Sequence, residues 1–255
     1  MRSREWLCGL TAALTTVAPC AWAATAHALL AAQRQRIESA DYRVSGRLVQ
    51  VDASGARTTD RLTIEARGFP GVLRILVEVT SPPKARIHLL LETHYNGRTS
   101  IQIAHPGERA PEALPFDRWS EGPLGSGFSY EDFLEQEYFW PTQTAAGEAK
   151  FGARDCDVVV SEPGPEEWTH YARVKTWLDH TIGFPVYAEK TLKETGVVKE
   201  FTYFDLRHDE GVWSAGQVEA KTRGQAGSTF LIVDRGSAKA NLNLGEFSPA
   251  QLTRF

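Results

Sequence analysis

The stretch WTHYARVKTWLDHTIGFPVYAEKTLKETGVVKEFTYF, residues 168–204, decides the fold class of this chain. Apolar and polar side chains alternate along it in three successive runs. A period of two is typical of a strand that has one buried and one solvated face. Gly183 separates the first two runs and Thr195-Gly196 the last two, and glycine readily adopts the positive φ of a hairpin turn. The stretch therefore predicts an antiparallel meander.

Runs with the same alternation flank this stretch on both sides. The clearest are residues 72–80 and 85–93, in which one face of each strand is apolar. Counting all such runs gives about eleven strands separated by short turns. The sequence therefore predicts a mainly β fold, a curved antiparallel sheet with few helices. One of these helices is expected at residues 29–39.

A second helix is expected directly after a long, irregular segment that is rich in proline and glycine. Ser129 is a favourable N-cap residue, Asp132 stands three positions later to reach back to the cap, and Phe128 can pack on Phe133 as a hydrophobic staple. Proline cannot continue a helix, so Pro141 ends this one after about ten residues. Its many aromatic side chains predict that it packs against the sheet.

Five blocks of the sequence carry a further signal. They are Thr80-Ser81-Pro82-Pro83 before the apolar run 87–91, then Gly125-Ser126-Gly127-Phe128-Ser129-Tyr130-Glu131-Asp132, Tyr171-x-x-Val174-x-x-Trp177-Leu178-Asp179, Pro185-Val186-Tyr187-x-Glu189-Lys190 and Thr195-Gly196-x-x-Lys199-Glu200. In these blocks, which cover most of the chain, the sequence resembles the LolA-like family of periplasmic outer-membrane lipoprotein-sorting proteins. The blocks also follow one another in the family's order.

The resemblance implies an incomplete, half-open β-barrel whose short helices form a lid over an apolar cavity for acyl chains. On the residues alone, the aromatic helix could equally be plain core. With the resemblance, we expect ligand contacts from the apolar strand positions and the lid. The predicted ligand-binding residues are Leu89, Leu91, Ile101, Phe128, Tyr130, Phe133, Tyr138, Trp140 and Trp177.

Two functions fit this resemblance. The first is a carrier that binds acyl chains of lipoproteins or other lipids and moves them across the periplasm towards the outer membrane. An inner-membrane transporter of the RND type is then the expected partner. The second is a periplasmic module that senses lipids and regulates a partner, as similar half-barrels do in anti-sigma regulation.

The N-terminus predicts export. Residues 1–23 have the form of a signal peptide, because a basic start precedes an apolar core at residues 6–18 and the small-x-small site Ala21-Trp22-Ala23. That core is shorter than the roughly 20 residues of a membrane-spanning helix. A lipid anchor at Cys20 is disfavoured by the proline before it. Residues 24–255 are expected to form a single periplasmic domain.

Composition and motifs argue against several other classes of protein. Hydrophobic residues make up 42% and charged residues 24%, which are ordinary globular values, and the net charge of −4 disfavours a nucleic-acid partner. The seven histidines show no H-x-x-x-H or H-x-H spacing, and the G-x-S-x-G and phosphate-loop motifs are missing from the sequence. Cys156 is expected to be a small buried hydrophobic residue. The sequence therefore predicts no enzyme, no metal site and no cofactor.

Overall fold

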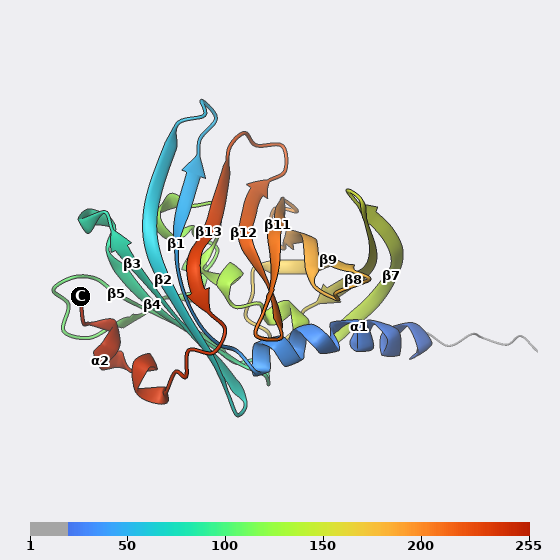
Figure 1. The fold of residues 1–255 in the computed structure, drawn as a ribbon, viewed down its shortest axis with the longest axis horizontal. Helices are drawn as coiled ribbons and strands as arrows, with labels where there is room; N and C mark the ends of the chain where they lie inside the picture. The colour runs from blue at the N-terminus through green and yellow to red at the C-terminus, as the bar shows by residue number, and fades with distance from the viewer. Residues whose placement is uncertain (1–19) are drawn as a thin grey trace, which may run out of the picture.

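The computed structural model describes residues 20–255 and, from Thr25 onward, their side chains. In this part of the chain, thirteen strands form one antiparallel sheet. The sheet is strongly curved and does not close, because β6 and β7 remain as free edges (Figure 1). The strands are β1 Asp41–Val51, β2 Arg57–Phe69, β3 Val72–Ser81, β4 Ile87–His94, β5 Thr99–Ala104, β6 Glu112–Ala113, β7 Thr142–Phe151, β8 Arg154–Glu162, β9 Tyr171–Asp179, β10 Pro185–Leu192, β11 Val198–Asp209, β12 Val212–Thr222 and β13 Ser228–Ser237.

The predicted mainly β, half-open architecture is confirmed. The meander of β9, β10 and β11 is also confirmed, since Tyr187 of β10 pairs with Trp177 on one side and with Thr202 on the other. The two additional strands are β5 and the very short β6, which the sequence analysis did not count.

The path of the chain explains where a site can form. The chain enters the sheet in its middle at β1 and proceeds strand by strand to the edge at β6. It then crosses to the opposite edge through residues 114–141 and returns from β7 to β13, which pairs with β1. Among the described strands, β1 and β13 are the only neighbours that are not consecutive in the sequence. We call their ladder the seam.

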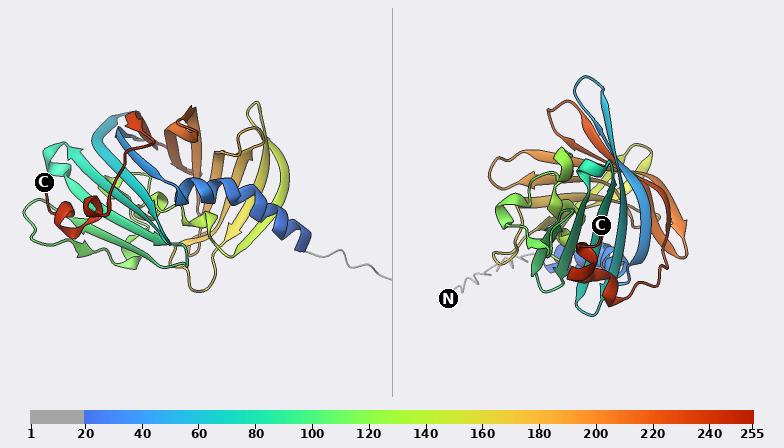
Figure 2. Two further views of the ribbon diagram at one scale, coloured as in Figure 1. Left: turned by 60° about the horizontal axis from the view of Figure 1, so that its bottom comes forward. Right: turned by 90° about the vertical axis from the view of Figure 1, so that its left-hand side faces the viewer.

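The concave face of the sheet is covered by α1 (Cys20–Glu38) and by the crossing segment, residues 114–141. Leu30 and Ile37 of α1 join Trp119 and Leu134 of the crossing segment in one hydrophobic core with the strands. The helix bridges the opening of the half-barrel, contacting β7 and β8 at one side and β2 and β3 at the other (Figures 1 and 2). No helix in residues 20–255 combines the length and hydropathy that a membrane span requires.

α1 begins earlier than the predicted helix at residues 29–39. Its first residues belong to the predicted signal peptide, the rest of which lies outside the described residues. The C-terminal end of α1 touches the sheet at Gly68, where a Cβ atom would stand 2.0 Å from the carbonyl oxygen of Glu38. Glycine is therefore needed at this position for the close approach of helix and strand.

A second layer covers the convex face of β3 to β5. Leu76 and Leu90 pack there against a C-terminal segment, with His88 Nδ1 2.8 Å from the carbonyl oxygen of Leu252 and the His88 ring stacked on Phe255. The sequence analysis expected only one buried face for these strands. The difference arises because the short helices η6 (Leu244–Phe247) and α2 (Pro249–Leu252) cover the other face.

The predicted ten-residue helix after Ser129 is wrong. The crossing segment contains only short 3₁₀ helices, namely η2 Phe116–Arg118, η3 Pro123–Gly125, η4 Tyr130–Phe133 and η5 Gln136–Tyr138, and η1 Pro83–Ala85 precedes β4. Glu135 breaks the segment between η4 and η5 with a φ of 47°. The physical reason lies in Asp132 and Glu137, which both contact Lys190. Five residues apart on an α-helix, they would point about 140° away from each other.

Candidate functional site

A cavity of about 590 Å³ lies on the concave face of the sheet, against the seam. Its walls come from the C-terminal end of α1, from β1 to β3, from β10 to β13 and from the crossing segment. The volume falls within the range of about 300–1,000 Å³ that is usual for small-molecule sites. The apolar side chains that line it include Val44, Ile64, Ile75, Phe128, Phe133, Phe184, Phe201, Val212, Trp213, Val218, Leu231 and Val233.

Two of the nine predicted ligand-binding residues, Phe128 and Phe133, line this cavity. Their rings lie 5.8 Å apart between centroids, in the arrangement expected of the staple, and Phe128 also packs 5.8 Å from Phe201. Gly127, directly before them, donates its N–H to Thr229 Oγ1 over 2.8 Å. The crossing segment is therefore fixed to β13 at the cavity wall.

The other seven predicted residues lie elsewhere. Five of them are buried in the main core, away from the cavity: Leu89, Leu91, Ile101, Tyr130 and Tyr138. Trp140 packs in a small separate cluster with Tyr171 and Val174. Trp177 lies beside Tyr187, with their ring centroids 4.9 Å apart, outside the cavity. A ligand contact for these seven residues stays a prediction, and the cavity geometry gives it no support.

Part of the cavity wall is charged, which the sequence analysis did not foresee. Five charged side chains of the wall form ion pairs, and a sixth residue, Lys199, pairs with Asp132 from outside the cavity lining. We call this set the cavity ion network, and it consists of Arg36, Asp132, Glu135, Glu137, Lys190 and Lys199.

Asp132 is the centre of this network. Its Oδ2 accepts hydrogen bonds from the Ser129 N–H at 2.7 Å and from Lys199 Nζ, while its Oδ1 accepts from Tyr171 OH at 2.7 Å and lies 3.6 Å from Lys190 Nζ. The bond to the Ser129 N–H is the reach-back predicted from the sequence. Through its contacts with Tyr171, Lys190 and Lys199, the Asp132 carboxylate links η4 to β9, β10 and β11.

The two lysines need this carboxylate because they stand directly opposite each other in β10 and β11. Like charges at such positions repel, and Lys190 and Lys199 are only 3% and 8% exposed. Asp132 contacts both ammonium groups, and Glu137 adds a second carboxylate oxygen 3.0 Å from Lys190 Nζ. The network is therefore balanced in charge within the protein.

The pKa values follow from this arrangement. Burial raises the pKa of Asp132, but Lys199 and Lys190 more than offset this, so that its pKa lies at about 2. Burial lowers the pKa of Lys190, and Glu137 and Asp132 reverse the effect and raise it above its ordinary range. Both groups are therefore charged at neutral pH.

A second anchor holds the crossing segment on the sheet. The fully buried Glu131 side chain accepts hydrogen bonds from Thr169 Oγ1 and the His170 N–H, each at 3.0 Å, and lies 3.1 Å from His170 Nδ1. Phe116 stacks on the His170 ring at 4.3 Å between centroids. The crossing segment is thus tied to the residues directly before β9 as well as to β10, β11 and β13.

Two tyrosines also line the cavity, Tyr42 from β1 and Tyr203 from β11. Neither hydroxyl has a hydrogen-bond partner among the described residues, and neither belongs to the fully buried unpaired polar atoms of this part of the chain. Burial and nearby Glu135 raise the pKa of Tyr42. Burial likewise raises the pKa of Tyr203, although Lys190 opposes it. Both phenols therefore keep their protons at neutral pH.

The sequence contains a signal that could have located the charged wall. In β10, Lys190 has the same parity as the buried Val186 and Ala188, and in β11 Lys199 has the same parity as Phe201. A lysine on the apolar face of a strand needs a buried partner, so it marks a polar site.

One side of the cavity carries exposed charges at the hairpin between β11 and β12. Asp209 and Glu210 line the cavity there and have no ion-pair partner among residues 20–255. The nearby Arg207 is already paired with Asp205. This rim of the cavity is therefore acidic.

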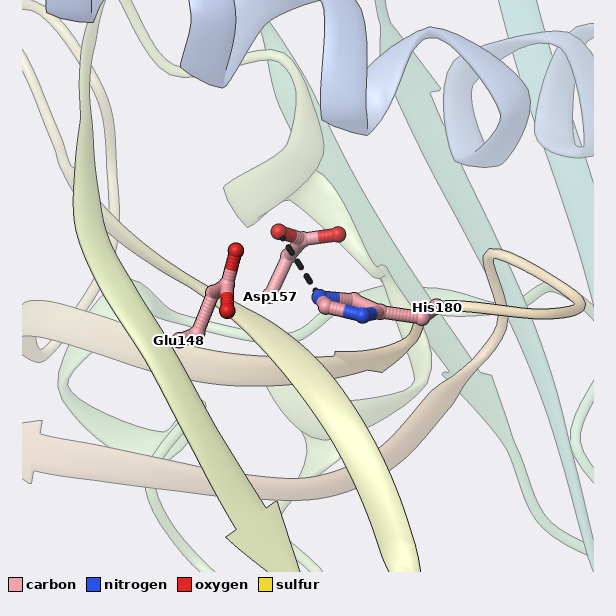
Figure 3. Close-up of side chains that lie close together, drawn as sticks. All are labelled: Glu148, Asp157 and His180. Carbon is pink, nitrogen blue, oxygen red and sulfur yellow. Dashed lines mark ion pairs between the residues drawn. The ribbon is translucent and has the colours of Figure 1, made fainter.

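A different group of side chains could offer ligands to a metal ion. Glu148, Asp157 and His180 bring one ligand atom each within 4.8 Å of one another (Figure 3). Glu148 stands directly opposite Asp157 in β7 and β8, and His180 Nε2 lies 3.1 Å from Asp157 Oδ1. Because an ordinary surface ion pair accounts for this proximity, the cavity is the stronger candidate site.

Comparisons with known proteins agree with this architecture. A family model described only as an uncharacterized protein matches residues 74–254. A solved domain from Vibrio parahaemolyticus, described as an outer membrane lipoprotein-sorting protein, superposes with a TM-score of 0.82 at 18% identity and covers 91% of this chain and 100% of its own.

Two further solved structures share the fold. A DUF1329 family protein from Desulfovibrio piger has a TM-score of 0.81 at 14% identity, over 91% of this chain and 99% of its own. A LolA superfamily protein from Nitrosomonas europaea has a TM-score of 0.67 at 16% identity, over 89% and 99%. No curated protein matches the sequence at a significant level.

Proposed function

We propose, from its membership of the family whose model matches residues 74–254 and from the fold that it shares with a LolA superfamily protein and an outer membrane lipoprotein-sorting domain, that this chain is a LolA-like periplasmic carrier. In this proposal it binds acyl chains of lipoproteins or other lipids in the cavity at the seam. The observation that carries the proposal is the cavity itself. It offers many apolar side chains and room for a small amphiphile, on the concave face of a sheet that does not close. Burying apolar chain surface there supplies about 25 cal/mol per Å².

The location and the transport partner are part of the same proposal. The signal-peptide pattern at residues 1–23 supports export to the periplasm. Intact mass of the protein purified from the periplasm is expected to match a chain that begins at Ala24, and a diacylated Cys20 would contradict this. An inner-membrane transporter of the RND type, which the family resemblance implies, is expected to co-purify after cross-linking in cells.

The function is tested by extracting protein purified without detergent with organic solvent and identifying the extract by mass spectrometry. We expect close to one lipid per chain. Phe133→Asp places a carboxylate in the apolar wall and is expected to abolish lipid retention, because an unpaired buried charge is costly. Phe204→Asp makes the same change at an exposed residue of β11 outside the cavity, and is expected to retain lipid.

A folded Phe133→Asp protein with full lipid content would contradict the carrier proposal. The alternative, a lipid-sensing regulatory module, predicts instead the stable capture of a membrane-anchored regulator. No feature of the cavity favours that alternative over the carrier.

A further inference from the structure

The cavity is not uniformly apolar, and its polar wall restricts the chemistry of the ligand. We propose that the ligand carries an uncharged, hydrogen-bonding polar group, such as the ester and hydroxyl groups of a glyceride, which enters the cavity with the acyl chain and binds the hydroxyls of Tyr42 and Tyr203. This inference rests on the proposed function and names the class of amphiphile that the same site takes.

The first argument is the charge balance of the cavity wall. Every member of the cavity ion network has a partner of opposite sign within the protein. A carboxylate or phosphate group of a ligand would therefore enter without a free cation to pair with. Burying an unpaired charge costs several kcal/mol, whereas a neutral polar group needs only hydrogen bonds.

The second argument is the pair of unused hydroxyls. Tyr42 and Tyr203 line the cavity from β1 and β11, which lie on opposite sides of β12 and β13. Protonated phenols donate hydrogen bonds, and carbonyl and hydroxyl oxygens accept them. A glyceryl ester offers such acceptors directly beside its acyl chain.

The third argument is the acidic rim formed by Asp209 and Glu210. Both carboxylates are exposed, and an anionic headgroup approaching this side of the cavity meets charges of its own sign. Repulsion of this kind lowers the affinity for anionic ligands and leaves the affinity for neutral ligands unchanged. It acts against free fatty acids and phosphate headgroups, and it does not act against glycerides.

The experiment measures displacement of a fluorescent fatty-chain probe from delipidated protein at pH 7.5. The competitors share a sixteen-carbon chain and differ in their polar end: 1-palmitoylglycerol is neutral, palmitate is anionic and hexadecane is apolar. We expect 1-palmitoylglycerol to bind at least about tenfold more tightly than palmitate. Tyr42→Phe and Tyr203→Phe are each expected to weaken 1-palmitoylglycerol about three- to tenfold, the usual effect of one hydrogen bond, and to leave hexadecane unchanged.

Tyr187→Phe is the matched control. Its hydroxyl bonds Glu200 outside the cavity, so its loss is expected to leave every competitor unchanged. Palmitate binding as tightly as 1-palmitoylglycerol, or cavity tyrosine variants that bind 1-palmitoylglycerol like the parent, would overturn this inference while leaving the carrier proposal intact. Failure of all three competitors to bind would overturn both.

Discussion

Replacing Asp132 by Asn is expected to be one of the most damaging single changes in the protein, although the side chain keeps its shape. The carboxylate accepts hydrogen bonds from the Ser129 N–H, Lys199 and Tyr171. An amide has only one acceptor oxygen, so its NH₂ group would face a donor on one side. The change also leaves Lys199 without the carboxylate that it contacts.

The magnitude follows from burial. Asp132 has a side-chain exposure of 1% and Lys199 of 10%, so water cannot replace the lost partner. Removing one member of a buried ion pair typically costs about 3–5 kcal/mol. We expect a loss of this size in the free energy of unfolding at pH 7, measured by urea denaturation with tryptophan fluorescence, with little change in the slope of the transition.

Two further variants isolate the cause. Adding Lys199→Met to Asp132→Asn removes the stranded charge, and the double variant is expected to recover part of the lost stability. Glu200→Gln makes the same carboxylate-to-amide change at the exposed pair with Arg223, whose side chains are 26% and 48% exposed, and is expected to cost no more than about 1 kcal/mol. An Asp132→Asn protein within 1 kcal/mol of the parent would refute the reasoning.

Further predictions concern acid stability, the core, the helix contact and the thiol. The drop of the Asp132 pKa from 3.8 to about 2 contributes about 2 kcal/mol of stability above pH 4, and urea titrations should show it lost as the pH falls from 4 to 2; Asp132→Asn should abolish this part of the pH dependence. Leu89→Ala removes a 1% exposed core side chain and is expected to cost about 2–5 kcal/mol without changing the lipid content of the folded protein, whereas lipid loss would place Leu89 in the ligand site. Gly68→Ala forces α1 away from β2 and should lower the melting temperature by several degrees, while an unchanged value would contradict the close approach. Burial raises the pKa of the Cys156 thiol, so a thiol reagent at pH 8 should label it only after unfolding, and rapid labelling of native protein would show an open site.

The sequence predicted the strands well where one face meets the core. Alternation identified β3 and the meander of β9 to β11, because local side-chain parity is enough to show a half-buried strand. It failed at β5, because this strand has only six residues, Thr99–Ala104, and a short run gives a weak periodic signal, and it failed at η4 and η5. At η4 and η5 the capping signals at Ser129 are real. A single α-helix does not form, because Asp132 and Glu137 both contact Lys190 and could not do so from one continuous helix.

The cavity was predictable only in part. Phe128 and Phe133 follow from the staple pattern, which is local in sequence. The sequence does not predict that Tyr42, Lys190 and Tyr203 line one cavity. Their proximity depends on the curvature of the sheet and on the pairing of β1 with β13. Leu89 shows the converse limit: alternation indicates that it is buried, but it cannot tell a packed core from an open cavity.

The seam has a consequence for the order in which the molecule folds. Every other ladder in the described sheet joins strands that follow each other along the chain. Residues 41–113 and residues 142–237 can therefore each form their strand pairs by closing short loops only. Among the ladders of the described sheet, only that of β1 with β13 joins strands that are distant in the sequence, and the entropy of closing that large loop makes it a slow step. Because the cavity is lined from both sides of this ladder, we expect it to be completed last. A bound amphiphile would then hold two pre-folded halves together, and hydrogen exchange at β1 and β13 would slow when it binds.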